Sequence, residues 1–195
     1  MDTTRFEASI SRWNLLNHPF YQAWNQGTLP MSDLQTYARE YGAFIASIPQ
    51  GWTTLGDTKH AAEEVEHAEL WQQFAQGLDT RVTGANEVTE MATLVDRATA
   101  LFGDRATAIG ALYAFEAQQP RTSATKLVGL EAHYSLPAGA EQYFVTHADE
   151  YGEAEILQRA FDALEPSEQD VAAQACEEVC ECLWDALSGV YSGDC

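Results

Sequence analysis

A histidine–glutamate–histidine pattern in the first half of the chain could bind a metal ion. His60, Glu64 and His67 stand at positions i, i+4 and i+7, which lie on one face of an α-helix. Two imidazole nitrogens and a carboxylate oxygen on one stripe can coordinate the same ion. The opposing interpretation is a solvated acidic helix face, since further glutamates crowd residues 63–69. The pattern favours a site more for Glu64 and His67 than for His60.

Two residues on later segments could coordinate the same ion. Glu116 ends the apolar run Leu112–Glu116, so its carboxylate is expected to be buried, and a buried charge is costly unless it is paired or bound to a metal. The alternative is a structural carboxylate satisfied by a tyrosine, an arginine or an amide near Pro120. His147 lies on the same predicted helix as Tyr143 and Phe144, and a lone histidine beside aromatic residues is more often a core or surface residue than a ligand.

Together these residues predict a metal centre inside a helical bundle. Facing helices assemble carboxylate–histidine iron and manganese sites in this way. Mixed oxygen and nitrogen ligation without cysteine suits iron or manganese better than structural zinc. The predicted ligands are Glu64, His67, Glu116 and His147, with His60 as a further candidate.

Lysine is nearly absent from the chain, which makes Lys126 conspicuous. Only Lys59 and Lys126 are lysines among the 10 basic residues. A retained lysine is either tolerated drift or an amine that the chemistry needs. Several tyrosines are candidates for the core first, and for redox chemistry or substrate binding second: Tyr21, Tyr37, Tyr41 and Tyr113.

The 4 cysteines all lie near the C-terminus, at positions 176, 180, 182 and 195. Cys176 and Cys180 are one helical turn apart, which is typical of small apolar core residues. Their C-x3-C-x-C spacing is not a recognised zinc pattern. A cytosolic chain would keep them reduced.

The charge balance is strongly acidic, with 30 acidic residues, 10 basic residues and a net charge of -20. A field this negative repels nucleic acid and anionic membranes, so neither is an expected partner. The acids are spread along the whole chain and lysine is rare, which favours adaptation to high salt over an acidic surface for a basic partner. The sequence shows neither a secretion signal nor a run long enough to span a bilayer, and a cytoplasmic location is expected.

Every long periodic segment predicts a helix, and no stretch alternates like a strand. Pro120 should kink or break the apolar helix expected from about residue 106 to 130. The next helix is expected over about 139–164, with a bend at Gly152. The pattern predicts an all-α fold of about seven helices in one bundle, with residues 1–195 forming a single domain.

Three segments carry motifs that occur together in one known group of proteins. They are residues 18–41, with His18-Pro19-Phe20-Tyr21 and Tyr37-Ala38-Arg39-Glu40-Tyr41; residues 67–75, with His67-Ala68-Glu69-Leu70-Trp71; and residues 112–147, with Leu112-Tyr113-Ala114-Phe115-Glu116-Ala117-Gln118-Gln119-Pro120, Lys126 and His147. In this order they resemble the haem-oxygenase-like oxidases, the group of TenA, PqqC and the CADD-type iron oxidases. The resemblance spans nearly the whole chain and is most specific in the third segment, where it points to the CADD type.

The resemblance implies a seven-helix bundle with a central pocket that commonly forms homo-oligomers, and a homodimer is expected here. Many members hold a di-iron or iron–manganese centre that activates molecular oxygen. CADD-type members make p-aminobenzoate by consuming one of their own tyrosines, with a lysine implicated as the nitrogen source. The matching positions are Tyr21 for the tyrosine, Lys126 for the lysine, and His67, Glu116 and His147 for metal ligands.

The chain departs from the family pattern after His147. That pattern continues His-x3-Asp-x2-His, whereas Tyr151 and Ala154 occupy the two later positions here. The first glutamate of the family lacks a clean counterpart, and Glu64 substitutes for it at the Glu-x2-His spacing of other members. The ligand count therefore supports one metal, and supports two only with help from His60, Glu63 or Glu150.

These departures leave a second class of function open. The alternative is a metal-free member: a cofactor-independent oxidase, a TenA-like hydrolase, or a bundle that binds a small aromatic molecule or a protein without chemistry. The TenA-like option is the weaker one, because all cysteines lie in the tail and none matches the pocket cysteine of that group.

Overall fold

The computed structural model describes residues 4–193, and helices form every regular element within that range. Eleven α-helical segments occur there, nine of which have at least 8 residues, where the sequence predicts seven. Their bounds are α1 (Thr4–Arg12), α2 (Pro19–Gln26), α3 (Met31–Ile45), α4 (Ile48–Thr54), α5 (Thr58–Gly77), α6 (Thr89–Leu101), α7 (Arg105–Glu116), α8 (Gln119–His133), α9 (Gln142–His147), α10 (Gly152–Asp162) and α11 (Pro166–Val190), with a 3-10 turn, η1 (Leu15–Asn17). Cys195 lies outside the described residues. The all-α prediction is confirmed and the count of seven is corrected.

The additional helices arise where two predicted helices are interrupted. The segment around Pro120 breaks into α7 and α8, and Pro120 lies in the first turn of α8, where its missing N–H removes no intrahelical hydrogen bond. The predicted helix over 139–164 breaks between His147 and Gly152 rather than bending at Gly152. The second break decides which residues of α10 face the interior.

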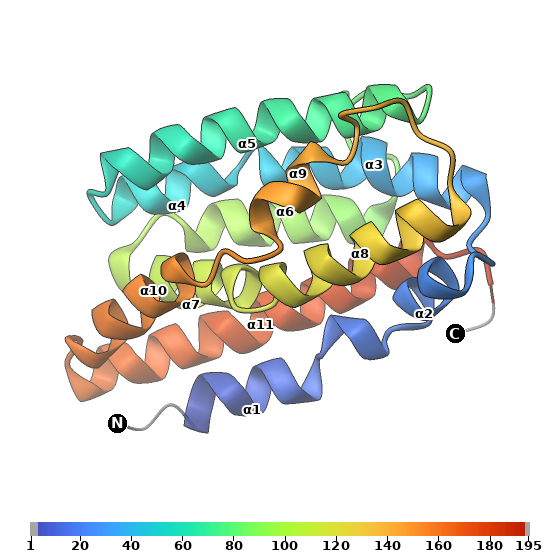
Figure 1. Ribbon diagram of the computed structural model, residues 1–195. Coiled ribbons are helices and arrows are strands. Elements are labelled where there is room, and N and C mark those ends of the chain that lie inside the picture. The colour runs from blue at the N-terminus through green and yellow to red at the C-terminus, as the bar shows by residue number, and fades with distance from the viewer. Residues whose placement is uncertain (1–3, 194–195) are drawn as a thin grey trace.

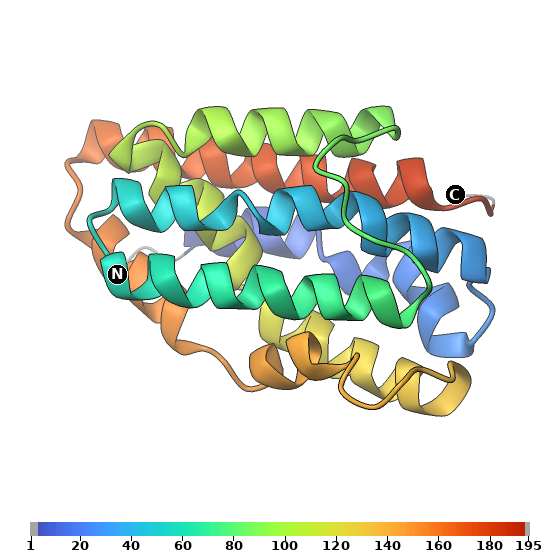
Figure 2. The ribbon, with the colours of Figure 1, turned by 90° about the horizontal axis from the view of Figure 1, so that it is seen from above.

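Most of the helices run along one long axis, while the yellow-green α7 crosses the others obliquely (Figures 1 and 2). Helix α7 packs against α11, α10 and α4, and α5 packs against α3, α4 and α9. Glu116, at the end of α7, is therefore surrounded by other helices. Within residues 4–193, no helix combines the length and apolar character needed to cross a bilayer.

Gly110 lies where the backbones of α7 and α11 approach each other closely. A Cβ atom at this position would overlap the carbonyl oxygen of Ala172 and lie 2.7 Å from its carbonyl carbon. Both atoms belong to the backbone, so the clash cannot be relieved by a side-chain rotation. The two helices meet here only because residue 110 has no side chain.

Replacing Gly110 with alanine is expected to destabilise the protein by about 3 kcal/mol, because the two helices must separate. Urea unfolding followed by circular dichroism in molar KCl measures the change. The control is Gly103→Ala, whose Cβ would lie 3.2 Å from the oxygen of Ala100 and which should change stability by less than about 1 kcal/mol. Equal stability of the Gly110 and Gly103 variants would contradict the assigned packing.

Candidate metal centre

Five acidic and histidine side chains converge in the interior from four helices. Glu64 and His67 lie one turn apart on α5. Asp57 caps the start of this helix, where its side chain accepts a hydrogen bond from the backbone N–H of His60. The other three come from the end of α7, the end of α9 and the first turn of α10: Glu116, His147 and Glu153. The three glutamates are only 1%, 2% and 5% exposed, in sequence order. Burial of this many ionisable groups in one place is costly unless a counter-charge joins them.

Glu64, His67 and His147 form one compartment, the histidine compartment. The Nδ1 atom of His67 lies 3.0 Å from Glu64 Oε1 and 3.2 Å from His147 Nε2. On its other side, His147 donates from Nδ1 to the carbonyl oxygen of Tyr143 at 2.6 Å. This bond leaves the Nε2 lone pair of His147 facing the cluster, an arrangement that orients histidine ligands at metal sites.

Glu64, Glu116 and Glu153 form a second compartment, the carboxylate compartment. Each offers one oxygen, and the three oxygens lie within 4.8 Å of one another. Both oxygens of Glu116 and the Oε2 atom of Glu64 are buried without a hydrogen-bond partner among the described residues. Unpaired buried carboxylate oxygens are rare in folded proteins, and a bound cation would satisfy them. The donors therefore fit an iron or manganese ion.

The electrostatics of the cluster show how strongly its groups interact. Burial raises the pKa of Glu116 well above its usual range, and the charges of Glu153 and Glu64 raise it further. Burial, followed by the charge of Glu64, raises the pKa of Glu153 to about 7. Burial lowers the pKa of His67, but its hydrogen bond to Glu64 and that carboxylate's charge outweigh the effect, so the net pKa is raised. Burial and the neighbouring His67 lower the pKa of His147 to about 4.

Four of the five predicted ligands thus meet at one place, and His60 lies apart from them. Its Nδ1 atom is 2.7 Å from Asp57 Oδ2. Its ring stacks on Trp52 with centroids 4.9 Å apart. The structure places His60 in the first turn of α5 as a partner of the capping aspartate.

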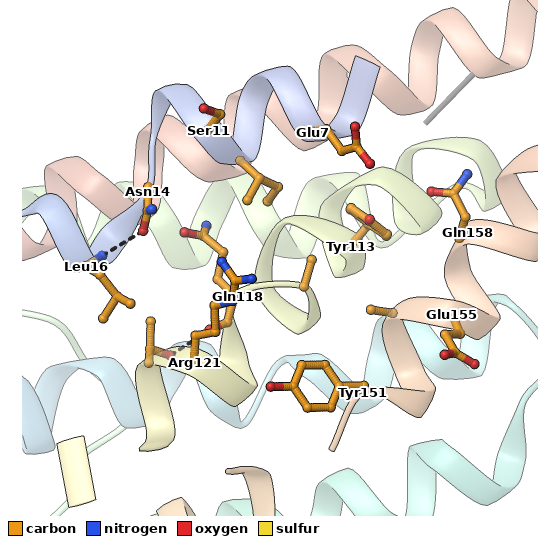
Figure 3. Close-up of a pocket in the computed structure, with 14 residues that line it drawn as sticks. Glu7, Ser11, Asn14, Leu16, Tyr113, Gln118, Arg121, Tyr151, Glu155 and Gln158 are labelled. Atoms are coloured by element: carbon orange, nitrogen blue, oxygen red, sulfur yellow. Dashed lines mark hydrogen bonds between the residues drawn. The ribbon is translucent and has the colours of Figure 1, made fainter. Parts of the chain in front are cut away.

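Sequence reasoning missed Glu153. The chain leaves the helix after His147 and re-enters one at Gly152, so the family spacing no longer describes which residues face inward. Tyr151 is exposed, and both Tyr151 and Ala154 line a surface pocket of about 550 Å³ instead. Figure 3 shows Tyr151 at this pocket with Tyr113, Gln118 and Arg121.

Lys126 forms a second buried polar site with two tyrosines. Its Nζ atom donates to the hydroxyl of Tyr37 at 3.0 Å, and that hydroxyl lies 3.2 Å from the hydroxyl of Tyr21. The amine is also 5.1 Å from the ring centroids of Tyr21 and Phe144. Lys126 is 2% exposed, and burial lowers its pKa to about 7. Lys59, in contrast, has a side chain that is 73% exposed and pairs with the surface residue Glu63.

Aromatic rings connect the lysine site to the metal ligands. The ring of Tyr37 lies 5.5 Å from Trp71, and Trp71 lies 4.8 Å from Tyr143, measured between centroids. Tyr143 in turn lies 4.2 Å from the ring of His147. The amine and the carboxylate–histidine cluster are therefore two ends of one buried region.

Sequence comparison relates the chain to one family of proteins. Residues 38–185 match a protein family described as "Iron-containing redox enzyme". The "4-aminobenzoate synthase" of Chlamydia pneumoniae is 28% identical, covering 93% of this chain and 91% of that protein. The protein of the same name from Nitrosomonas europaea is also 28% identical, covering 97% of this chain and 90% of its own length.

Solved structures share the fold at lower sequence identity. A domain from Shewanella denitrificans with a haem-oxygenase-like fold superimposes with a TM-score of 0.78 at 15% identity, covering 97% of this chain and 92% of that one. A TenA homologue from P. horikoshii gives a TM-score of 0.76 at 13% identity, with 100% of both chains covered.

Proposed function

The chain belongs to the haem-oxygenase-like family of iron-containing redox enzymes, and from this membership we propose that it is an oxygen-activating oxidase that forms 4-aminobenzoate from one of its own tyrosines. The observation that carries the proposal is the buried amine of Lys126, which lies beside the Tyr21 ring and is joined by aromatic contacts to the carboxylate–histidine cluster. The relatives named 4-aminobenzoate synthase support the same reaction.

The proposed ligands of the metal centre are Glu64, His67, Glu116 and His147. When bound, iron or manganese would supply activation of molecular oxygen and the oxidising power for the reaction. The protein holds His147 in one orientation through Tyr143 O, and it holds His67 against Glu64. The surrounding aromatic residues exclude water from the centre, which strengthens electrostatic interactions within it.

The proposed role of Lys126 is to donate the nitrogen of the product, and that of Tyr21 is to donate the aromatic ring. With a pKa of about 7, a large fraction of the Lys126 side chains are neutral near neutral pH, and only the neutral amine has a lone pair for bond formation. Tyr37 accepts a hydrogen bond from that amine and contacts the Tyr21 hydroxyl, so it positions both reacting groups.

The test is a single-turnover experiment on the purified protein. Protein purified in molar KCl without chelator is loaded anaerobically with Fe(II) and then exposed to oxygen. We expect 4-aminobenzoate at no more than one molecule per chain, and peptide mass spectrometry should locate the altered residue at Tyr21. The Tyr21→Phe variant should form no product.

Tyr134→Phe is the control, because Tyr134 is half-buried and its hydroxyl donates to Leu29 O away from Lys126. It should form product at the wild-type level. Product formation by Tyr21→Phe would remove the role of that tyrosine. Turnover that survives chelation would overturn the proposal in favour of a cofactor-independent oxidase.

A further inference from the structure

We propose that Glu153 is a metal ligand, which completes the carboxylate compartment with Glu64 and Glu116 as a second, all-oxygen site for a hard divalent cation such as Mn²⁺. This inference rests on the proposed function, since both place metal at the same centre. It goes further by assigning to that centre a ligand, Glu153, that the family spacing does not contain. The chemistry of the ligand set also sets a preference for the type of ion.

The position of Glu153 supports this role. It lies in the first turn of α10 (Gly152–Asp162), and α10 packs against α7, the helix that ends at Glu116. Neighbouring residues of α10 face outward, because Ala154 and Glu155 line the surface pocket. Glu153 is only 5% exposed. Its acidic side chain therefore points into the protein, although nearby positions on the same helix face solvent.

The oxygens of the compartment are free to bind an ion. Both oxygens of Glu116 are buried without a hydrogen-bond partner in the described part of the chain, as is Glu64 Oε2. The three carboxylates each place an oxygen within 4.8 Å of the others. Around an octahedral ion with bonds of about 2.1 Å, ligand oxygens lie about 3.0–4.2 Å apart. Small side-chain adjustments therefore bring these oxygens to coordination distance.

Glu64 divides its two oxygens between the compartments. Its Oε1 atom lies 3.0 Å from His67 Nδ1 in the histidine compartment, while its buried Oε2 atom has no partner among residues 4–193. One carboxylate can therefore contact two ions. The two sites differ in chemistry, because imidazole suits iron, whereas a set of carboxylates alone suits Mn²⁺ or Mg²⁺.

Equilibrium binding of Mn²⁺ to metal-free protein tests the inference without measuring activity. Bound Mn²⁺ is counted from the loss of the six-line electron paramagnetic resonance signal of the free ion, in molar KCl and without oxygen. We expect two ions per wild-type chain, and we expect them to be spin-coupled because they share Glu64. We expect Glu153→Gln to bind one ion with unchanged affinity and to show the signal of an isolated ion, the second site being weakened about 100-fold or more.

Glu155→Gln is the matched control, because Glu155 lies on the same helix but is exposed and pairs with Arg159 at the surface. It should bind two ions like the wild type. The metal-free Glu153→Gln variant should melt at or above the wild-type temperature, since glutamine keeps the volume and removes an acid from a buried acidic cluster. Two coupled ions in Glu153→Gln would overturn this inference alone. No binding by the wild-type chain would overturn both the inference and the metal-dependent function.

Discussion

Replacing Lys126 with methionine is expected to abolish the proposed formation of 4-aminobenzoate and, at the same time, to stabilise the protein at neutral pH. The product would lose its nitrogen donor. The stability gain follows from burial, which lowers the pKa of Lys126 from its usual 10.5 to about 7. Methionine fills a similar volume with an apolar, flexible side chain, so the buried amine is removed without leaving a large cavity.

The sign of the pH dependence follows from the protons bound in each state. Between pH 7 and 10.5 the unfolded chain holds a proton on Lys126 that the folded chain has released, so the stability of the wild type rises with pH. The cost of the buried amine is about 4 kcal/mol at pH 7 and about 2 kcal/mol at pH 9. The lost hydrogen bond to Tyr37 offsets about 1 kcal/mol of that gain.

Urea unfolding of both proteins at pH 7, 8 and 9 measures this difference. The variant is expected to be more stable by about 3 kcal/mol at pH 7, and the advantage should shrink as the pH rises. The control Lys59→Met removes an exposed ion pair with Glu63 and should change stability by less than about 1 kcal/mol. A Lys126→Met variant that is less stable than the wild type at every pH would contradict the assigned cost of the buried amine.

The sequence predicted those site residues whose positions depend on local periodicity. Glu64 and His67 face inward together because they lie one turn apart within one unbroken helix, α5. Glu116 was identified because a carboxylate in an apolar helix must be buried. The inward direction of these side chains follows from the sequence of a single helix, whatever the packing between helices.

Glu153 could not be predicted in the same way, because the direction of its side chain depends on the break between α9 and α10. A one-residue change in the length of that break would turn a different residue of α10 inward. The environment of Lys126 likewise depends on how separate helices pack together. The aromatic rings around its amine come from α2, α3, α5 and α9, and a rare lysine in the sequence indicates only that the position is unusual.

Replacing Glu64 with glutamine is expected to prevent uptake of both metal ions, a larger loss than any other single change at the centre. Glu64 belongs to both compartments, and its two oxygens face different neighbours. An amide has one oxygen, while its nitrogen carries protons and cannot act as a second ligand. Metal analysis after anaerobic loading with Fe(II) should find less than about 0.1 ion per chain.

Glu63→Gln is the control, since Glu63 adjoins Glu64 on α5 but pairs with Lys59 at the surface, and its metal content should equal that of the wild type. The comparison with Glu153→Gln separates two roles for Glu64. If Glu64 bridges the compartments, its loss removes two ions where the loss of Glu153 removes one. If Glu64 only orients His67 through their 3.0 Å contact, the glutamine variant retains metal, because the amide oxygen can still accept that hydrogen bond. Full metal content in Glu64→Gln would therefore assign Glu64 to positioning His67, and coordination would rest on the remaining side chains.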